Sequence, residues 1–300
     1  MRVAVIGLGN IGGGVAGNLA EAGHDVHVAD LDEGRVAAMV ARGATAADDA
    51  VAAVHEAEFV FTSLPGPTQI RGVADDILDA MPPGTVWLEL STNDTTTFHE
   101  LRERAAAVDV EMIDAPVSGG PEGAQAGTLS IFVGATSEKA ATIEPLLNDI
   151  GTAIYFLGPP GAGIATKIAQ VTLCYTQTVT LIESMILGAK AGVDPTTMLD
   201  VITNSAGTSY SAEAYGPEIL AGTYDASFPL SHAAKDLRLA MDLAADVGAE
   251  LPFTSTVAEL YAQAVETYGP TAAHCLAAQL IEQRNNTILS DTVSSEGAPR

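Results

Sequence analysis

Residues 161–193 read GAGIATKIAQVTLCYTQTVTLIESMILGAKAGV, and this stretch separates two halves of the chain that have different patterns. Between Gly163 and Gly192 it contains no proline, and Gly188 is its only glycine. Residues that favour helices dominate it, so we predict a helix of about eight turns over residues 163–191. Short β-branched runs alternate with helical runs before it, whereas we find only helical patterns after it. The sequence therefore predicts a long helix that joins an α/β domain to an all-α domain.

The chain begins with a strand, a glycine-rich turn, a helix and a second strand. The apolar run over residues 2–6 is typical of a buried parallel strand, and residues 26–30 form the next strand. The turn between them reads Gly7-Leu-Gly-Asn-Ile-Gly12, a G-x-G-x-x-G fingerprint. Its glycines allow a tight turn, close approach of a pyrophosphate and packing of the helix, whose N-terminal N–H groups bind phosphate. We predict dinucleotide contacts from Gly7, Gly9, Asn10, Ile11, Gly12 and Asp30.

Asp30, at the end of the second strand, bears on which dinucleotide is bound. Its carboxylate would accept hydrogen bonds from the ribose hydroxyls and would repel a 2′-phosphate. The first arginine after it is Arg35. We therefore predict NAD as the cofactor, with NADP less favoured.

The alternation of strands and helices continues to about residue 160. Further strands are predicted over residues 59–64, 85–90, 110–114, 130–134 and 153–157. This pattern predicts a doubly wound Rossmann domain over residues 1–162, in which ligands bind at the carboxyl ends of the strands. The loops after the strands that end at residues 64 and 90 therefore offer either further cofactor contacts or ordinary turn and cap residues. The candidates are Leu64, Pro65, Gln69 and Thr92.

Another strand end carries the loop Asp114-Ala-Pro-Val-Ser-Gly-Gly120. Its serine and two glycines are rich in hydrogen-bond donors, and exposed backbone N–H groups of this kind bind anions. The loop is either a carboxylate site or a plain connection, and its residues alone do not decide between these.

The second half of the chain predicts an all-helical domain over residues 163–289. Helices are expected from Pro195 to about Asn204, after Pro229, after Leu251 and from Thr271 to about Ile288, followed by a loose tail over residues 290–300. Apolar stripes on these helices suit a core and a subunit interface. We predict a homodimer or homotetramer.

Charge and composition exclude several classes of protein. Thirteen basic residues face 38 acidic ones, for a net charge of −25, which argues against nucleic acid and anionic membranes as partners. The six histidines show no metal-ligand spacing, so no metal is predicted. Cys174 and Cys275 lie in apolar helical contexts and are predicted to be buried free thiols. The chain starts directly with a strand and has no predicted membrane span, which predicts a cytoplasmic protein.

Four motifs together resemble the β-hydroxyacid dehydrogenases, the family of 3-hydroxyisobutyrate dehydrogenase and tartronate semialdehyde reductase. They occur in the family's order and span residues 7–240. The loop ending at Gly120, followed by Gly127-Thr-Leu, is the most specific match. The motifs are Gly7-Leu-Gly-Asn-Ile-Gly12 with Asn18-Leu19, Asp114-Ala-Pro-Val-Ser-Gly-Gly120, Gly161-Ala-Gly-Ile-Ala-Thr-Lys167 and Lys235-Asp-Leu-Arg-Leu-Ala240.

The resemblance implies a role for each motif. Ser118, Gly119 and Gly120 would hold the carboxylate and hydroxyl of the substrate, and Thr92 would touch the cofactor. Lys167 would be the general acid/base, a task that suits a lysine whose pKa is lowered in a partly dry cleft. Lys235 would lie near the nicotinamide and close the cleft. Lys167 and Lys235 are two of only four lysines in the chain.

The sequence departs from the family one helical turn after Lys167. The family carries Asn there, whereas this chain has Val171. Residues four apart share a helix face, so an apolar group replaces an amide beside the lysine. Gln170, three residues after Lys167, is near enough to substitute partly. We therefore include Gln170 and Val171 among the candidate substrate residues.

These observations predict an NAD-dependent oxidoreductase that interconverts a small 3-hydroxyacid and its semialdehyde. Its partner is a small carboxylated alcohol or aldehyde. Two alternatives stay open. One is a reductase of a different carbonyl or imine on the same scaffold, with Val171 as the reason. The other is a regulatory protein that binds NAD without turnover, against which the intact Lys167 and Lys235 argue.

Overall fold

The computed structural model describes residues 1–290, and the chain folds into two compact units. The first unit comprises Met1–Lys167, and the second begins at Ile168. The long helix α8 (Ala162–Lys190) starts in the first unit and continues into the second. This confirms the long helix predicted over residues 163–191.

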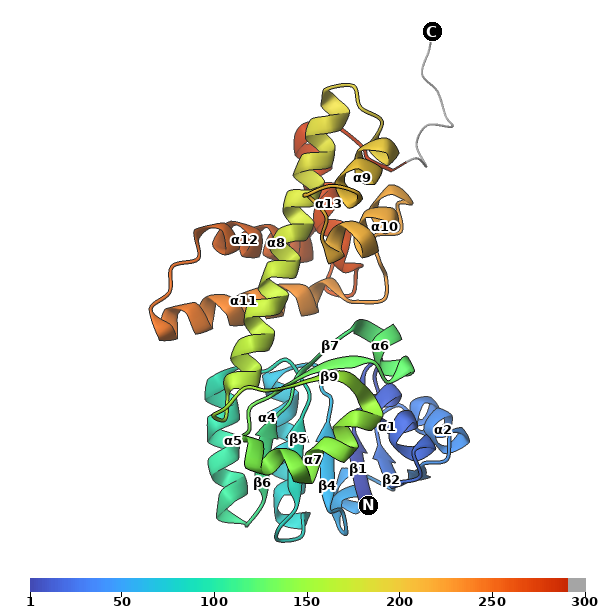
Figure 1. Cartoon of the computed structure of the whole chain (residues 1–300), viewed down its shortest axis with the longest axis vertical. Coiled ribbons are helices and arrows are strands. Elements are labelled where there is room, and N and C mark those ends of the chain that lie inside the picture. The colour runs from blue at the N-terminus through green and yellow to red at the C-terminus, as the bar shows by residue number, and fades with distance from the viewer. Residues whose placement is uncertain (291–300) are drawn as a thin grey trace. The chain divides into compact units, whose positions relative to one another are not determined.

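The first unit is built on a six-stranded, wholly parallel sheet in the order β3-β2-β1-β4-β5-β6. Figure 1 shows β2, β1, β4, β5 and β6 side by side in this order. The strand order reverses beside β1, which is where doubly wound sheets bind dinucleotides. The strands are β1 (Arg2–Ile6), β2 (Asp25–Ala29), β3 (Thr45–Ala46), β4 (Phe59–Thr62), β5 (Val86–Glu89) and β6 (Glu111–Asp114).

Helices connect these strands. α1 packs against α2, whereas α4 packs against both α3 and α5. Because parallel crossovers are right-handed, the reversal of strand order beside β1 places these two groups on opposite faces of the sheet. Side chains of Asp32, Asp49 and Asp94 cap three of the helices. The helices are α1 (Gly12–Glu21), α2 (Glu33–Ala41), α3 (Ala50–Val54), α4 (Pro67–Ile77), the 3₁₀ turn η1 (Leu78–Ala80) and α5 (Thr95–Ala107).

The last three strands of the first unit form a separate sheet in the order β7-β8-β9. β7 runs antiparallel to β8, and β9 runs parallel to it. The sequence predicts strands for β8 and β9, whereas it assigns the residues of β7 to a loop. It also does not predict that these strands leave the main sheet, because strand pairing is a long-range property. The elements are β7 (Val117–Ser118), α6 (Gly120–Ala126), β8 (Leu129–Val133), α7 (Ser137–Ile150) and β9 (Gly151–Phe156).

One apolar core lies under both sheets of the first unit. Fully buried Val3, Val5 and Phe61 from the main sheet share it with Leu129 and Ile131 of the small sheet. Strands buried on both faces explain the continuous apolar runs in the sequence. The core therefore fixes both the turn after β1 and the loop before β7.

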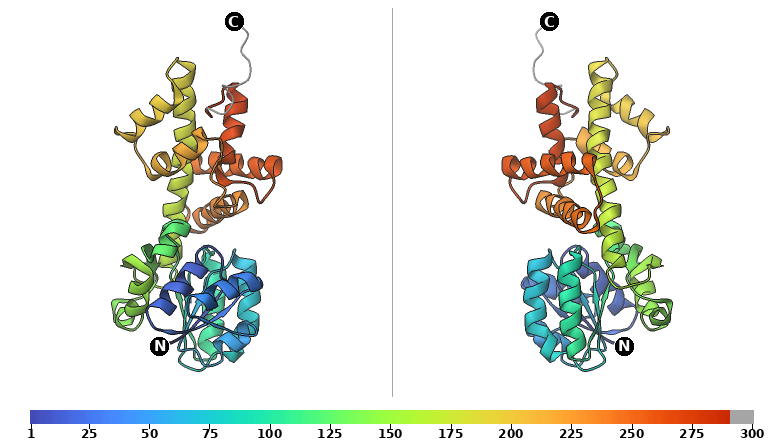
Figure 2. Two further views of the ribbon diagram at one scale, coloured as in Figure 1. Left: turned by 90° about the vertical axis from the view of Figure 1, so that its right-hand side faces the viewer. Right: turned by 90° about the vertical axis from the view of Figure 1, so that its left-hand side faces the viewer.

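The second unit is helical and surrounds the rest of α8. Figure 2 shows α9 on one side of this part of α8 and α12 and α13 on the other. Its core includes Ile182, Met185, Leu237 and Tyr261, none of which is exposed. Its elements are α9 (Pro195–Thr203), the π-helical turn η2 (Ser211–Tyr215), α10 (Gly216–Leu220), α11 (Leu230–Val247), α12 (Pro252–Tyr268), the 3₁₀ turn η3 (His274–Leu276) and α13 (Ala277–Asn285).

The end of the second unit differs from the prediction. A single helix is predicted over residues 271–288, whereas the structure has a 3₁₀ turn and then α13. The reason is tertiary: Ala273 forms a β-bridge with Pro229, and the N–H of His274 donates to the Phe228 carbonyl oxygen. These contacts hold the segment extended until His274. From residue 291 on, the predicted tail lies outside the described residues.

Candidate functional site

The turn after β1 is shaped by its glycines. Gly7 has φ +86°, and a Cβ on it would lie 2.3 Å from the Ser63 carbonyl oxygen. A Cβ on Gly12 would lie 1.9 Å from the Gly7 carbonyl oxygen, so a side chain there would push the helix off the strand. A Cβ on Gly9 would meet only Arg35 Nη1, at 3.8 Å. Gly7 and Gly12 are therefore packed against backbone atoms, whereas the turn is open at Gly9, which fits the close approach of a pyrophosphate.

Asp30 is fixed at the end of β2 by backbone donors. Its Oδ2 accepts a hydrogen bond from the Leu8 N–H at 2.5 Å, and its Oδ1 accepts one from the Asp32 N–H at 2.8 Å. Its side chain is 11% exposed, and Arg35 Nη1 lies 3.9 Å from Asp30 Oδ2. The Asp30 carboxylate is thus held beside the glycine turn, where a residue that binds the ribose of a dinucleotide is expected.

Arg35 lies beside the glycine turn and is not among the predicted cofactor residues. Its guanidinium lies between Asp30, Asp32 and the open side of Gly9. A cation at this position would attract a 2′-phosphate and so opposes the preference that Asp30 imposes. Its position in the first turn of α2, directly after β2, is the signal that could have identified it.

A buried hydrogen-bonded chain ties the loop after β4 to the loop after β5. Trp87 Nε1 donates to Thr62 Oγ1 at 2.8 Å, and Thr62 Oγ1 donates to Glu89 Oε1 at 3.3 Å. Ser91 Oγ also donates to Glu89 Oε1, and it accepts a hydrogen bond from the Leu64 N–H at 2.8 Å. Glu89 is 1% exposed. These hydrogen bonds hold the two loops together at the carboxyl edge of the sheet.

The other predicted cofactor residues lie around these loops and the glycine turn. Pro65, Gln69 and Asn10 are exposed, and Thr92 is half-buried. Ile11 is half-buried and packs against the apolar core. All of them belong to the first unit, which also contains the fingerprint and Asp30.

The predicted substrate loop is a sharp turn from β7 into α6. Gly119 has φ +130° and Gly120 has φ +64°, conformations that residues with a Cβ rarely adopt. Gly119 is exposed, and Ser118, which pairs with Ser130 of β8, is half-buried. The turn therefore presents serine and backbone groups at an accessible position, as a carboxylate site requires.

Lys167 is the sixth residue of α8 and the last residue of the first unit. Its side chain is half-buried. Gln170 is exposed, whereas Val171 is 8% exposed and belongs to the apolar core of the second unit. The structure thus places Lys167 in the same unit as the Ser118 loop, and Val171 among core residues.

Lys235 lies in the second unit, in a polar cluster buried between α8 and α11. Its Nζ lies 3.1 Å from Asp236 Oδ1, and Tyr175 Oη donates to Asp236 Oδ2 at 3.1 Å. Asp236 is 3% exposed, so its carboxylate is almost wholly removed from water. Burial, reinforced by the Asp236 charge, raises the pKa of Tyr175 well above its usual range, so the phenol stays a donor. Asp236, which pairs with Lys235, and Tyr175, which donates to Asp236, are absent from the predicted set.

A second cluster in the same unit has the residue types of a nucleophilic site. His274 Nε2 lies 3.2 Å from Cys275 Sγ, and His274 Nδ1 lies 3.4 Å from Asp225 Oδ2. Cys275 is fully buried and His274 is 1% exposed. Burial raises the pKa of the Cys275 thiol well above its usual range, whereas a reactive cysteine needs a lowered pKa. The cluster is therefore structural.

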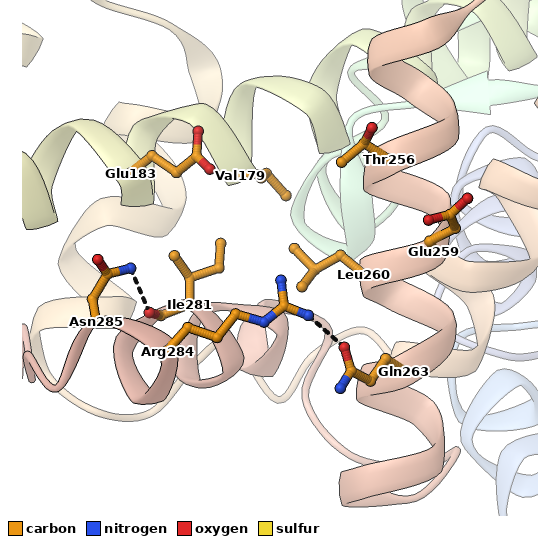
Figure 3. Close-up of a pocket in the computed structure, with 9 residues that line it drawn as sticks. All are labelled: Val179, Glu183, Thr256, Glu259, Leu260, Gln263, Ile281, Arg284 and Asn285. Carbon is orange, nitrogen blue, oxygen red and sulfur yellow. Dashed lines mark hydrogen bonds between the residues drawn. The ribbon is translucent and has the colours of Figure 1, made fainter.

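A cavity of about 270 Å³ lies between α8, α12 and α13 of the second unit. Figure 3 shows Arg284 directed toward Gln263, and Glu183 and Glu259 are also among the residues that line the cavity. Arg284 Nη2 donates to Gln263 Oε1, so part of its hydrogen-bonding capacity is already used. None of the predicted site residues lines this cavity.

Three further observations concern the described residues. Among residues 1–290 there is no group of three or more His, Cys, Asp or Glu side chains that could hold a metal ion. Within the same range, no helix has the length and apolar character needed to span a membrane. Cys174 and Cys275 are both free thiols; Cys275 is buried as predicted, whereas Cys174 is half-buried.

Two family models match the chain in succession. The model of the NAD binding domain of 6-phosphogluconate dehydrogenase matches residues 2–158. The model described as NAD-binding of NADP-dependent 3-hydroxyisobutyrate dehydrogenase matches residues 161–281. Their junction falls at the start of α8.

Known proteins match over most of the chain. It is 36% identical over 265 residues to 2-(hydroxymethyl)glutarate dehydrogenase of Eubacterium barkeri, which covers 87% of this chain and 88% of that protein. It is 34% identical over 270 residues to NAD-dependent L-serine dehydrogenase of Pseudomonas aeruginosa, covering 87% and 91%. A solved structure of Mycobacterium tuberculosis 3-hydroxyisobutyrate dehydrogenase with L-serine superposes with a TM-score of 0.85 at 30% identity, covering 93% of this chain and 98% of the other.

Proposed function

Because the chain belongs to the β-hydroxyacid dehydrogenase family, which includes the 3-hydroxyisobutyrate dehydrogenases, we propose that it interconverts a small 3-hydroxyacid and its semialdehyde with NAD. At the level of the family, the chain is an NAD(P)-dependent oxidoreductase that acts on CH–OH groups. One observation carries the finer proposal. The glycine turn, the Ser118 loop and Lys167 all belong to one compact unit, and each lies in a motif that resembles the family's.

Lys167 is the general acid/base in this proposal. In the oxidative direction the hydroxyl proton passes to the neutral Nζ of Lys167. A hydride leaves the carbon that bears this hydroxyl, so that the C–O single bond becomes a carbonyl. When bound, NAD would supply the acceptor for that hydride. In the reverse direction the Lys167 ammonium protonates the carbonyl oxygen. A positioned acid/base group of this kind contributes roughly 10²–10⁴-fold to the rate.

Ser118, Gly119 and Gly120 hold the carboxylate of the substrate. The accessible Ser118 and Gly119 and the positive φ angles of the two glycines support this role. Backbone donors suit a chain with a net charge of −25, because they bind an anion without relying on scarce basic side chains.

The names of the matched relatives narrow the substrate class. They act on 2-(hydroxymethyl)glutarate, L-serine and 3-hydroxyisobutyrate. These compounds share a primary alcohol on the carbon next to the one that bears the carboxylate, and they differ in the substituent on that middle carbon. We propose a substrate of the same pattern, a 3-hydroxypropanoate with one substituent at C2.

The cofactor of the proposal is NAD. Asp30, held by the Leu8 and Asp32 N–H groups, would repel a 2′-phosphate. Arg35 lies close enough to weaken this effect without removing the carboxylate.

A second candidate is a reductase of a different carbonyl or imine. It is favoured by Val171, because the family's amide is replaced by a valine on the Lys167 face of the helix. A homodimer or homotetramer is part of both proposals, and light scattering at micromolar concentration tests it.

The experiment that tests the function is consumption of NADH and NADPH with a panel of aldehydes. The panel contains methylmalonate, tartronate and succinic semialdehydes, glyoxylate and a sulfonated analogue. We expect NADH-dependent turnover of a C2-substituted semialdehyde. NADH binding without turnover of any carboxylated aldehyde would contradict the proposal and favour the second candidate.

Lys167→Ala tests the acid/base assignment. We expect kcat to fall by about 10²–10⁴-fold with NADH affinity unchanged. The matched control is Lys190→Ala, which removes a lysine from the last turn of the same helix and should leave kcat unchanged. If Lys167→Ala keeps more than about a tenth of the wild-type kcat, the assignment is wrong.

A further inference from the structure

The first turn of α8 is capped from a distant part of the chain. The residue before the helix is Gly161, which has no side chain with which to satisfy the free N–H groups of a helix start. Asp114, at the end of β6, supplies the acceptors instead. Its Oδ1 accepts from the Gly161 N–H at 2.9 Å, and its Oδ2 accepts from the Ile164 N–H at 3.0 Å. One carboxylate thus replaces both halves of a capping box, across 47 to 50 residues of sequence.

Glycines make the space for this carboxylate. A Cβ on Gly134 would lie 2.0 Å from Asp114 Oδ1, and a Cβ on Gly163 would lie 2.9 Å from Asp114 Oδ2. The Gly163 position is also closed by the Phe132 carbonyl oxygen, 2.1 Å away. The Gly134 N–H donates to the Asp114 carbonyl oxygen at 2.8 Å. Asp114 therefore joins the end of β6, the end of β8 and the start of α8 in one closely packed arrangement.

The charge of Asp114 is fully buried. The residue is 0% exposed, and burial raises the pKa of its carboxyl, while hydrogen bonds from the Gly161, Gly163 and Ile164 N–H groups oppose this rise. A buried carboxylate is costly unless hydrogen bonds compensate, and a neutral cap would avoid that cost. The arrangement thus does more than close a helix end.

Asp114 is connected to both segments that the proposed reaction must align. It is four residues before Ser118 in the same loop, and it grips Ile164, which lies one helical turn before Lys167 on the same helix face. Since a helix is stiff over one turn, a shift of its first turn moves the lysine relative to the Ser118 loop. Misplacement of a reacting group by about 1 Å can lower a rate by about 10²-fold.

We propose that Asp114 is a positioning residue that sets the placement and the proton affinity of Lys167 by clamping the start of α8 to the substrate loop. The inference rests on the proposed function, in which Lys167 is the acid/base. The Asp114 carboxylate also offsets the positive N-terminal end of α8, which otherwise favours the neutral form of Lys167. Loss of the charge should therefore make Lys167 easier to deprotonate.

Asp114→Asn tests the proposal because it keeps the size of the side chain and removes its charge. The amide can accept through only one atom, so one of the two helix N–H groups loses its acceptor. We expect kcat to fall by about 10- to 100-fold, with NADH affinity unchanged. We also expect the pH profile of kcat to move toward acid by about 0.2–0.7 pH unit, the range of charge effects at helix ends.

The matched control is Asp194→Asn. Asp194 caps α9 by accepting from the Thr197 N–H at 2.9 Å, so its loss weakens a helix end that belongs to the second unit. It should lower thermal stability without moving kcat or the pH profile. Both variants are assayed at a temperature at which both remain folded.

The outcomes separate the two claims. If Asp114→Asn matches Asp194→Asn in kcat and pH profile while Lys167→Ala is inactive, Asp114 is only a structural cap and the inference is overturned, although the proposed function stands. If Lys167→Ala is active, the acid/base assignment itself has failed. Should Asp114→Asn not fold, Gly134→Ala gives the same comparison, because its methyl would displace Oδ1 without changing the charge. The inference then requires a lower kcat with an unmoved pH profile, and an unchanged kcat overturns it.

Discussion

Gly12→Ala is the perturbation whose effect the structure defines most closely. The added methyl carbon would lie 1.9 Å from the Gly7 carbonyl oxygen and 3.0 Å from Ser63 Cβ. Since Cβ atoms do not approach other heavy atoms closer than 3.0 Å, the start of α1 must move away from the turn after β1. The obstructing atom belongs to the backbone, so no side chain can rotate aside to make room. Overpacking of this kind costs about 1–3 kcal/mol.

The same movement would withdraw the N–H groups of α1 from the position proposed for the cofactor phosphates. Losing one hydrogen bond to a charged group costs about 1.5–3 kcal/mol, so we expect NADH affinity to fall at least about tenfold. We expect the melting temperature to fall by roughly 2–12 °C, since each kcal/mol corresponds to about 2–4 °C in domains of this size.

The assay combines NADH fluorescence titration with thermal unfolding. Gly72→Ala is the matched control, because Gly72 is exposed in the middle of α4 and a Cβ there meets nothing within 4 Å. That variant should gain about 1 kcal/mol of stability from helix propensity and bind NADH normally. Wild-type NADH affinity and melting temperature in Gly12→Ala would refute the claim that this turn is closed by backbone contact.

Three further predictions concern selectivity, acid stability and the buried polar cluster. Asp30→Asn should lower the preference for NADH over NADPH by about tenfold, because like-charge repulsion of a 2′-phosphate is lost; unchanged ratios of kcat/KM for the two cofactors would contradict the role of Asp30. Burial lowers the pKa of His274, so the imidazole takes up its proton at a higher pH in the unfolded chain than in the folded protein. The free energy of unfolding should therefore fall as the pH drops below about 6.5. His274→Gln should reduce this dependence of the unfolding free energy on pH, as measured by urea titrations. Tyr175→Phe removes a hydrogen bond to the buried Asp236 carboxylate and should cost about 1.5–3 kcal/mol in urea unfolding, whereas a free energy within about 0.5 kcal/mol of the wild type would mean that the bond contributes little.

Local patterns in the sequence predict the elements that local interactions decide. The apolar run before Gly7, the fingerprint and Asp30 define a βαβ unit without tertiary information. Helix α8 lies within one residue of the predicted range at each end, because glycines flank a long run of helix-favouring residues. The family resemblance rests on the same short motifs, and the matches to known proteins confirm it.

Features that depend on distant partners could not be predicted in this way. The motif around Asp114 is visible in the sequence, but its bonds to Gly161 and Ile164 form only in the fold. Arg35 is brought over Gly9 by the turn between β2 and α2. The spacing of Val171 from Lys167 predicts that the two share a helix face, whereas the packing of Val171 in the core depends on helices later in the chain. The separate sheet of β7, β8 and β9 is likewise a matter of long-range pairing.

The lengths of the edge strands bear on how the protein behaves at high concentration. Each sheet has one edge strand of only two residues, β3 in the larger sheet and β7 in the smaller one. An edge strand exposes unpaired backbone groups that can recruit a strand from another molecule, and a short edge offers few of them. With a net charge of −25 adding repulsion between molecules, these two edges should resist edge-to-edge aggregation.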